Sequence, residues 1–177
     1  AGVVGRGEAM PMASFGTDHI INPFERFAEY LALAVAAPQR YRLIEILTGL
    51  PGSAMPQPHR PPRGRWIVCG YGRFGRAIVQ HLAPTGIELV VIDPEPGDTG
   101  GLPAVIGFGT EAAALIEAGI HDASGIVAGS DNDINNLSIA VTARELNPRL
   151  FVVTRQNQTA NGVLFDAFRD DFCMVPP

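Results

Sequence analysis

The chain has 177 residues, a formal net charge of −5 and a hydrophobic content of 46%. This length is sufficient for one domain with a sizeable core and an extension, and the negative charge argues against non-specific binding of nucleic acid, which requires a basic surface. All of the basic residues are arginines, which excludes lysine Schiff-base chemistry and a P-loop lysine. Because no grouping of Ser, His and acidic residues indicates a nucleophilic site either, we expect no catalytic residues and no enzymatic activity.

The four histidines and two cysteines lack the spacing of metal ligands, so we expect no metal site. No apolar segment has the length needed to span a bilayer, and no signal peptide is expected at the start. Any association with a membrane therefore has to come from elsewhere.

The two ends of the chain resemble each other weakly. Val3-Val4-Gly5-Arg6 is similar to Val152-Val153-Thr154-Arg155, and in both places an apolar segment that ends in proline follows later. If this is a repeat, residues 1–23 are the last part of one nucleotide-fold unit, and the chain comes from a longer tandem protein. Chance similarity is the alternative, because few residues are identical.

Two helices are predicted next, over residues 23–38 and 41–48, with Gly49 as a C-cap. They can pack as a hairpin on their own domain, or they can form a crossover or interface element. The second alternative is favoured because two short helices cannot bury so much Leu, Phe and Ala by themselves. We therefore assign residues 1–50 to the tail of a preceding unit plus interface helices, and the proline-rich residues 51–64 to a linker.

From Arg65 onward, short apolar runs alternate with helical patterns. The expected strands cover residues 66–69, 87–92, 104–107, 125–128, 150–154 and 172–175. The expected helices run from 73 to 83, from a cap at Thr110 to Gly119, from a cap at Asp131 or Asp133 to Leu146, and across 163–168. This alternation predicts an α/β fold, here a Rossmann-like doubly wound parallel sheet of six strands over residues 65–177.

A glycine motif, Gly70-Tyr71-Gly72-Arg73-Phe74-Gly75, follows the first strand at once. Gly70 permits a tight turn, Gly72 lets a phosphate approach bare backbone, and Gly75 lets the next helix pack closely on the strand. The helix N-terminus offers N–H groups to an anion, and the second strand leads into Asp93, whose carboxylate can accept hydrogen bonds from ribose hydroxyls. This order predicts a dinucleotide-binding unit; a glycine turn needed only for packing is the alternative.

The glycine motif and several local matches together resemble the RCK domain (regulator of K⁺ conductance), also called KTN or TrkA-N. The matches are Gly107-Phe108-Gly109-Thr110-Glu111, Leu115-Ile116-Glu117-Ala118-Gly119-Ile120, Ser130-Asp131-Asn132-Asp133-Ile134-Asn135-Asn136-Leu137 and Ala143-Arg144-Glu145-Leu146-Asn147-Pro148. The resemblance covers residues 65–177 and extends to residues 15–49.

This resemblance implies a ligand-sensing regulatory domain of a potassium channel or transporter, on the cytoplasmic side of the cell membrane. It implies binding of NAD(H) or of ATP, ADP or AMP, assembly into a homodimer or larger ring, and a pore that is fused or on another subunit. By the same resemblance, Arg73 would reach phosphate, Gly109 and Thr110 would line the adenine side, and Ser130 and Asp131 the far wall. Arg155 would face the same crevice, and the whole glycine motif, Tyr71 and Phe74 included, would contribute to binding.

Phe108 stands where the family has an aspartate after the third strand. An aromatic ring there can stack on a base or fill its place, so the ligand can be altered, weakly bound or absent. Asp93 has no arginine beside it at its strand end, which favours a free ribose 2′-OH and argues against NADP. Two alternatives remain: a degenerate, non-binding unit that serves as a subunit contact, and the cofactor-binding half of an NAD-dependent oxidoreductase.

Overall fold

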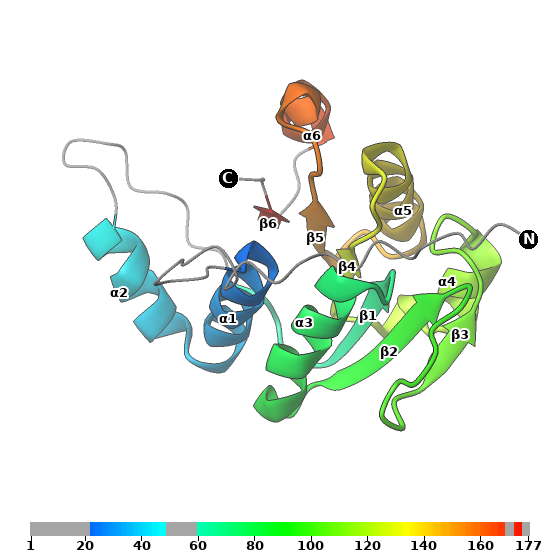
Figure 1. Cartoon of the computed structure of the whole chain (residues 1–177), viewed down its shortest axis with the longest axis horizontal. Coiled ribbons are helices and arrows are strands. Elements are labelled where there is room, and N and C mark those ends of the chain that lie inside the picture. The colour runs from blue at the N-terminus through cyan, green and yellow to red at the C-terminus, as the bar shows by residue number, and fades with distance from the viewer. Residues whose placement is uncertain (1–21, 49–59, 169–171, 175–177) are drawn as a thin grey trace, which may run out of the picture.

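The computed structural model describes residues 22–48, 60–168 and 172–174, which form one parallel sheet flanked by helices (Figure 1). The N-terminal segment that resembles the end of the chain, the expected cap Gly49 and residues 51–59 of the proline-rich segment lie outside the described residues. The division into a tail, a linker and a main domain therefore stays a prediction.

The sheet has six strands in the order β3-β2-β1-β4-β5-β6, and every neighbouring pair is parallel. The strands are β1 (Arg65–Cys69), β2 (Glu88–Asp93), β3 (Ala104–Ile106), β4 (Gly125–Ala128), β5 (Phe151–Arg155) and β6 (Phe172–Met174). The order reverses between β1 and β4, and a parallel sheet leaves a crevice outside the carboxyl ends of its strands at such a point. The predicted Rossmann-like fold is confirmed.

Helices cover both faces of the sheet. They are α1 (Pro23–Ala36), α2 (Pro38–Thr48), α3 (Arg73–Leu82), α4 (Ala112–Glu117), α5 (Asp133–Leu146) and α6 (Gly162–Phe168). Side chains of a strand alternate between faces, and Trp66 and Val68 of β1 pack with α1 and α3. Ile67 and Cys69 point the other way, into a second cluster with α4 and α5.

Helix α1 packs on α3, and the two lie side by side (Figure 1). Its fully buried residues include Ala28 and Leu31, which join the same core cluster as Trp66. The Glu25 carboxylate contacts the His81 ring of α3 at 2.7 Å. Helix α2 begins at Pro38, three residues earlier than expected, because proline is well tolerated in the first turn of a helix. Within the described residues, no helix combines the length and apolar character that a bilayer crossing requires.

Two predicted helix caps are wrong. Glu111, not Thr110, occupies the N-cap position of α4. Asn132, rather than Asp131 or Asp133, caps α5, and its side chain accepts a hydrogen bond from the Asn135 N–H at 3.1 Å. Residues 130–133 all carry side-chain oxygens that can cap a helix, so their spacing alone does not identify the residue that does.

Candidate functional site

A cavity of about 320 Å³ opens at the carboxyl ends of β1, β2, β4 and β5. This is the crevice expected where the strand order reverses. The predicted site residues that line it are Gly70, Gly72, Arg73, Phe74, Asp93, Gly109, Thr110, Ser130, Asp131 and Arg155. The fold therefore brings together residues that are more than 80 positions apart in the sequence.

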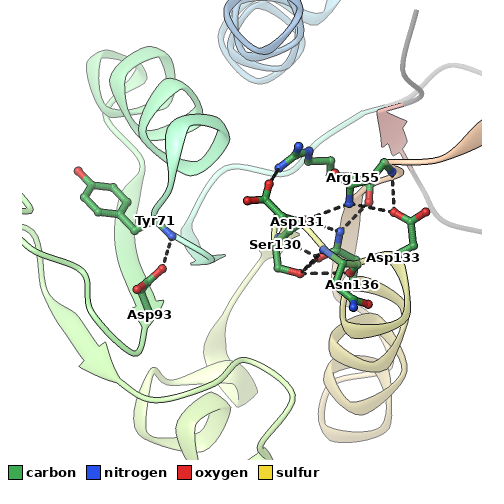
Figure 2. A network of polar contacts seen from close by, with 9 residues as sticks. Tyr71, Asp93, Ser130, Asp131, Asp133, Asn136 and Arg155 are labelled. Carbon is green, nitrogen blue, oxygen red and sulfur yellow. Dashed lines mark hydrogen bonds and ion pairs between the residues drawn. The ribbon is translucent and has the colours of Figure 1, made fainter. Parts of the chain in front are cut away.

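Tyr71 and Gly75 were also predicted to bind, but neither is among the residues that line this cavity, and Tyr71 instead lines a neighbouring hollow beside Asp93. The Tyr71 ring points away from Ser130 and Asp131 (Figure 2) and lies under the Arg76 guanidinium, 5.1 Å from the ring centroid. A Cβ added at Gly75 would lie 1.9 Å from the Gly70 carbonyl oxygen. Gly75 therefore serves the close packing of helix on loop, which is the role its place in the motif predicts.

The glycine loop presents bare backbone to the cavity. Gly70 has a φ of +91°, a conformation that favours glycine. A Cβ added at Gly72 would meet nothing within 4 Å, so the approach to the loop is open. Gly72 is also the N-cap residue of α3 and supplies no side-chain cap. The first-turn N–H groups of α3 are thus available to an anion at this position.

Asp93 ends β2 and holds the glycine loop. Its Oδ2 accepts a hydrogen bond from the Tyr71 N–H at 2.6 Å, and its Oδ1 accepts one from the Glu95 N–H at 2.8 Å (Figure 2). A carboxylate has about four lone-pair sites, so acceptor capacity remains toward the cavity. Asp93 and the glycine loop are therefore in direct contact. The motif requires this closeness, because the ribose bound by the acid is linked to the phosphate bound by the loop.

Asn136 fixes the opposite wall of the cavity. Its Oδ1 accepts hydrogen bonds from the N–H and the hydroxyl of Ser130, both at 2.8 Å, and its Nδ2 donates to the Ser130 and Arg155 carbonyls at 3.0 and 2.7 Å (Figure 2). The side chain is completely buried. Sequence reasoning included Asn136 in a family match but gave it no role, although a buried amide that ties together two strand ends sets the shape of the site.

Arg155 is the better buried of the two cavity arginines that the sequence singled out. Its Nη1 forms an ion pair with Asp131 at 2.5 Å, and its side chain is 14% exposed against 93% for Asp131. The guanidinium also lies 4.7 Å from the ring centroid of Phe24 in α1. Phe24 lines the cavity, and sequence reasoning missed it because its helical spacing predicted only an apolar packing face.

Phe108 lines the cavity and leaves it open. More than half of its surface is exposed, at 56%. The neighbouring Gly109 packs closely on Cys69, and burial raises the pKa of the Cys69 thiol to about 12. The thiol is therefore neutral and unreactive. Phe108 is placed to stack on a planar group that enters the cavity, and it does not plug the space.

Asp133 joins the start of α5 to the loop after β5. Its Oδ1 accepts hydrogen bonds from the Asn157 N–H and Nδ2, and its Oδ2 accepts them from the Gln158 N–H and the Asn161 Nδ2, at 2.5 to 3.1 Å. Burial raises the pKa of Asp133 and is the largest single influence, but the hydrogen bonds together outweigh it and lower the pKa below its usual value.

Stability is expected to fall in acid because of Asp133. A carboxyl whose pKa is lower in the folded than in the unfolded chain stabilises the fold fully above the unfolded value of about 3.9, and this contribution is lost as the pH falls through the folded value. Urea unfolding between about pH 6 and about pH 3 should show a smaller acid loss for Asp133→Asn than for the unchanged protein. Parallel curves for the two proteins would contradict the assignment.

The doubly wound sheet, the glycine loop and the acid at the end of β2 define a Rossmann-like domain. The model of the TrkA-N domain family matches residues 66–172, and the chain belongs to this family. It is 27% identical over 166 residues to the glutathione-regulated potassium-efflux system protein KefC of Enterobacter sp. (strain 638), covering 86% of this chain and 27% of that protein. The chain thus spans about a quarter of the length of this relative.

Two solved structures are similar in fold and in sequence. The Kef C-terminal domain of Shewanella denitrificans in its AMP-bound form has a TM-score of 0.58 and 25% identity, over 62% of this chain and 68% of that one. The GsuK channel bound to NAD has a TM-score of 0.56 and 26% identity, over 68% of this chain and 21% of that one.

Proposed function

We propose that this chain is a nucleotide-sensing regulatory domain of a potassium channel or transport system. The observation that carries the proposal is the open cavity at the β1/β4 switch point, with bare glycine backbone on one side and Asp93 in contact with that loop. Its volume of about 320 Å³ lies within the range of small-molecule sites. The names of the matched relatives, a potassium-efflux protein and a channel, support the transport context.

Each part of the cavity suits one part of an adenine nucleotide. Phosphate would approach Gly72 and the N-terminus of α3, where Arg73 and Arg155 supply positive charge. Asp93 would accept hydrogen bonds from the ribose hydroxyls, and the exposed Phe108 ring would stack on the base. The ligand then contacts the ends of several strands, so its binding can change how the domain presents its surface to a partner.

NAD(H), ATP, ADP and AMP are the proposed ligands, and NADP is not. An arginine beside the acid could accept the 2′-phosphate of NADP. The sequence places none at the end of β2, but the fold brings Arg76 near Asp93 in a neighbouring hollow of about 440 Å³. The Arg76 Nε, however, donates to the Tyr71 carbonyl at 3.1 Å, and Asp93 and Glu95 line the same hollow. Two carboxylates beside the ribose would repel a 2′-phosphate.

The proposed role is regulatory rather than catalytic. In the cavity, the Ser130 hydroxyl donates to the Asn136 side-chain oxygen and not to a base, and the buried Cys69 thiol is neutral. We propose that the domain acts as a homodimer or larger ring at the cytoplasmic face of the membrane and passes the ligand signal to a pore that is fused or on another subunit.

Calorimetric titration of the chain with NAD⁺, NADH, ATP, ADP and AMP tests the proposal. At least one of the five is expected to bind at one site per chain, and NADP⁺ is expected to bind more weakly than NAD⁺. If the folded protein binds none of them, the nucleotide-sensing function is wrong. Turnover of a hydroxyl substrate with NAD⁺ would favour the oxidoreductase alternative instead.

Asp93→Ala is expected to weaken the binding of a nucleotide that the protein accepts by about tenfold, because a charged acceptor for the ribose is lost. It should also lower the free energy of unfolding by about 1 kcal/mol, since the Tyr71 and Glu95 N–H groups lose their acceptor. Asp98→Ala is the matched control: Asp98 accepts one N–H in the same loop and lies outside both cavities. Equal nucleotide affinities for the two variants would contradict the proposed role of Asp93 in binding the ribose.

A further inference from the structure

The ring of Phe24 in α1 is close to two arginines of the cavity. The Arg155 guanidinium carbon is 4.7 Å from the centroid of its ring, and the Arg73 guanidinium carbon is 6.0 Å away. Both distances are within the range of cation–π interactions. The two arginines come from different strand ends, after β1 and at the end of β5, so the phenyl ring is a shared support for both.

The position of Phe24 is itself fixed. The Asn22 side chain accepts a hydrogen bond from the Phe24 N–H at 3.0 Å and starts the helix there. The Phe24 ring meets the Phe74 ring edge-on, with centroids 5.6 Å apart. Glu25, the next residue, contacts His81 of α3 at 2.7 Å. The first turn of α1 is therefore attached to the helix that follows the glycine loop.

This arrangement joins the cavity to a segment outside the matched family domain, which begins at residue 66. An arginine side chain loses much rotational freedom when it binds an anion, and a support that already orders it lowers that loss. Two guanidinium groups held near one ring also suit a phosphate, which accepts several charge-assisted hydrogen bonds.

We propose that Phe24 is a positioning residue for the phosphate part of the site, which couples the docking of α1 to nucleotide occupancy. The inference rests on the proposed nucleotide-binding function. Phe24 orients Arg73 and Arg155 before the ligand arrives, and a bound phosphate holds the two arginines against the ring in return. Because coupling between two equilibria is reciprocal, a nucleotide that binds more tightly when α1 is docked also stabilises the docked helix.

Three variants of the full chain separate this role from simple packing. Phe24→Leu removes the aromatic face and keeps an apolar side chain, whereas Phe24→Tyr keeps the face. Phe27→Leu is the matched control, because Phe27 packs on the same Phe74 ring at 5.7 Å but is not among the residues that line the cavity. We expect Phe24→Leu to weaken ADP binding about tenfold, Phe27→Leu about twofold or less, and Phe24→Tyr to restore most of the affinity.

Two further measurements separate positioning of the arginines from simple packing. They are the affinity for adenosine and the effect of ADP on amide hydrogen exchange in α1. Phe24→Leu should leave the affinity for adenosine, which has no phosphate, unchanged. In the unchanged protein, ADP should slow amide hydrogen exchange in residues 24–36 by about tenfold or more. Equal ADP affinities for Phe24→Leu and Phe27→Leu, or exchange in α1 that ADP does not alter, would overturn the inference. If no nucleotide binds the unchanged protein, the proposed function fails as well.

Discussion

Gly75→Ala is expected to lower the free energy of unfolding by about 3 kcal/mol or more, and Gly72→Ala by less than about 1 kcal/mol. The two glycines stand three residues apart in one motif, but their surroundings differ. A Cβ at Gly75 would overlap the Gly70 carbonyl oxygen at 1.9 Å, and backbone cannot move aside as the end of a side chain can. A Cβ at Gly72 points into open space. Urea unfolding of the two variants measures the difference.

Gly72→Ala, which should fold normally, is expected to lose nucleotide affinity instead of stability. Gly72→Ala places a methyl group where the phosphate approaches the loop, so the proposed binding should weaken by at least about tenfold. The variant therefore separates the fold from the site. A Gly75→Ala protein as stable as the unchanged one would show that the helix does not pack on the loop as closely as the structure has it.

Asp133→Asn is expected to lower the free energy of unfolding by about 3 kcal/mol, although it changes only one oxygen to an amide group. Each carboxylate oxygen of Asp133 accepts two N–H hydrogen bonds. An asparagine would turn its own NH₂ donors toward two of these partly buried N–H groups and leave them without an acceptor. The loss of both the charge and the acceptor in a site that is only 6% exposed gives the large effect.

Asp131→Asn is the matched control for this change. Asp131 is two residues earlier and its side chain is 93% exposed, so its ion pair with Arg155 contributes little in water. We expect the free energy of unfolding to change by less than about 0.5 kcal/mol. Urea unfolding at neutral pH measures both variants, and equal losses would mean that the hydrogen-bonded cluster around Asp133 does not stabilise the fold.

The sequence predicted the sheet well because its strands are short apolar runs separated by clear helical patterns. All six strands were expected, and β4 was predicted at its observed bounds, 125–128. Buried parallel strands carry apolar residues on both faces, which makes them conspicuous even without alternation. The glycine motif and Asp93 were also recognisable, since local backbone requirements determine their positions.

The parts of the site that were missed depend on contacts between distant segments. Asn136 ties the end of β4 to the end of β5, and Phe24 meets arginines that follow it by 49 and 131 positions. Neither helical spacing nor residue type distinguishes these residues from ordinary core or surface positions. The orientation of Tyr71 likewise depends on Arg76 and on the loop geometry, which no local pattern specifies.

The position of α1 has a consequence for biosynthesis. The helix leaves the ribosome before any strand of the sheet that it covers. The apolar face of α1, which includes Leu31, therefore stays exposed until α3 has been made. Its contact with Arg155 must wait still longer, for the end of β5. A nascent chain that stops before residue 151 would therefore hold α1 by its packing on α3 but without the contact with Arg155.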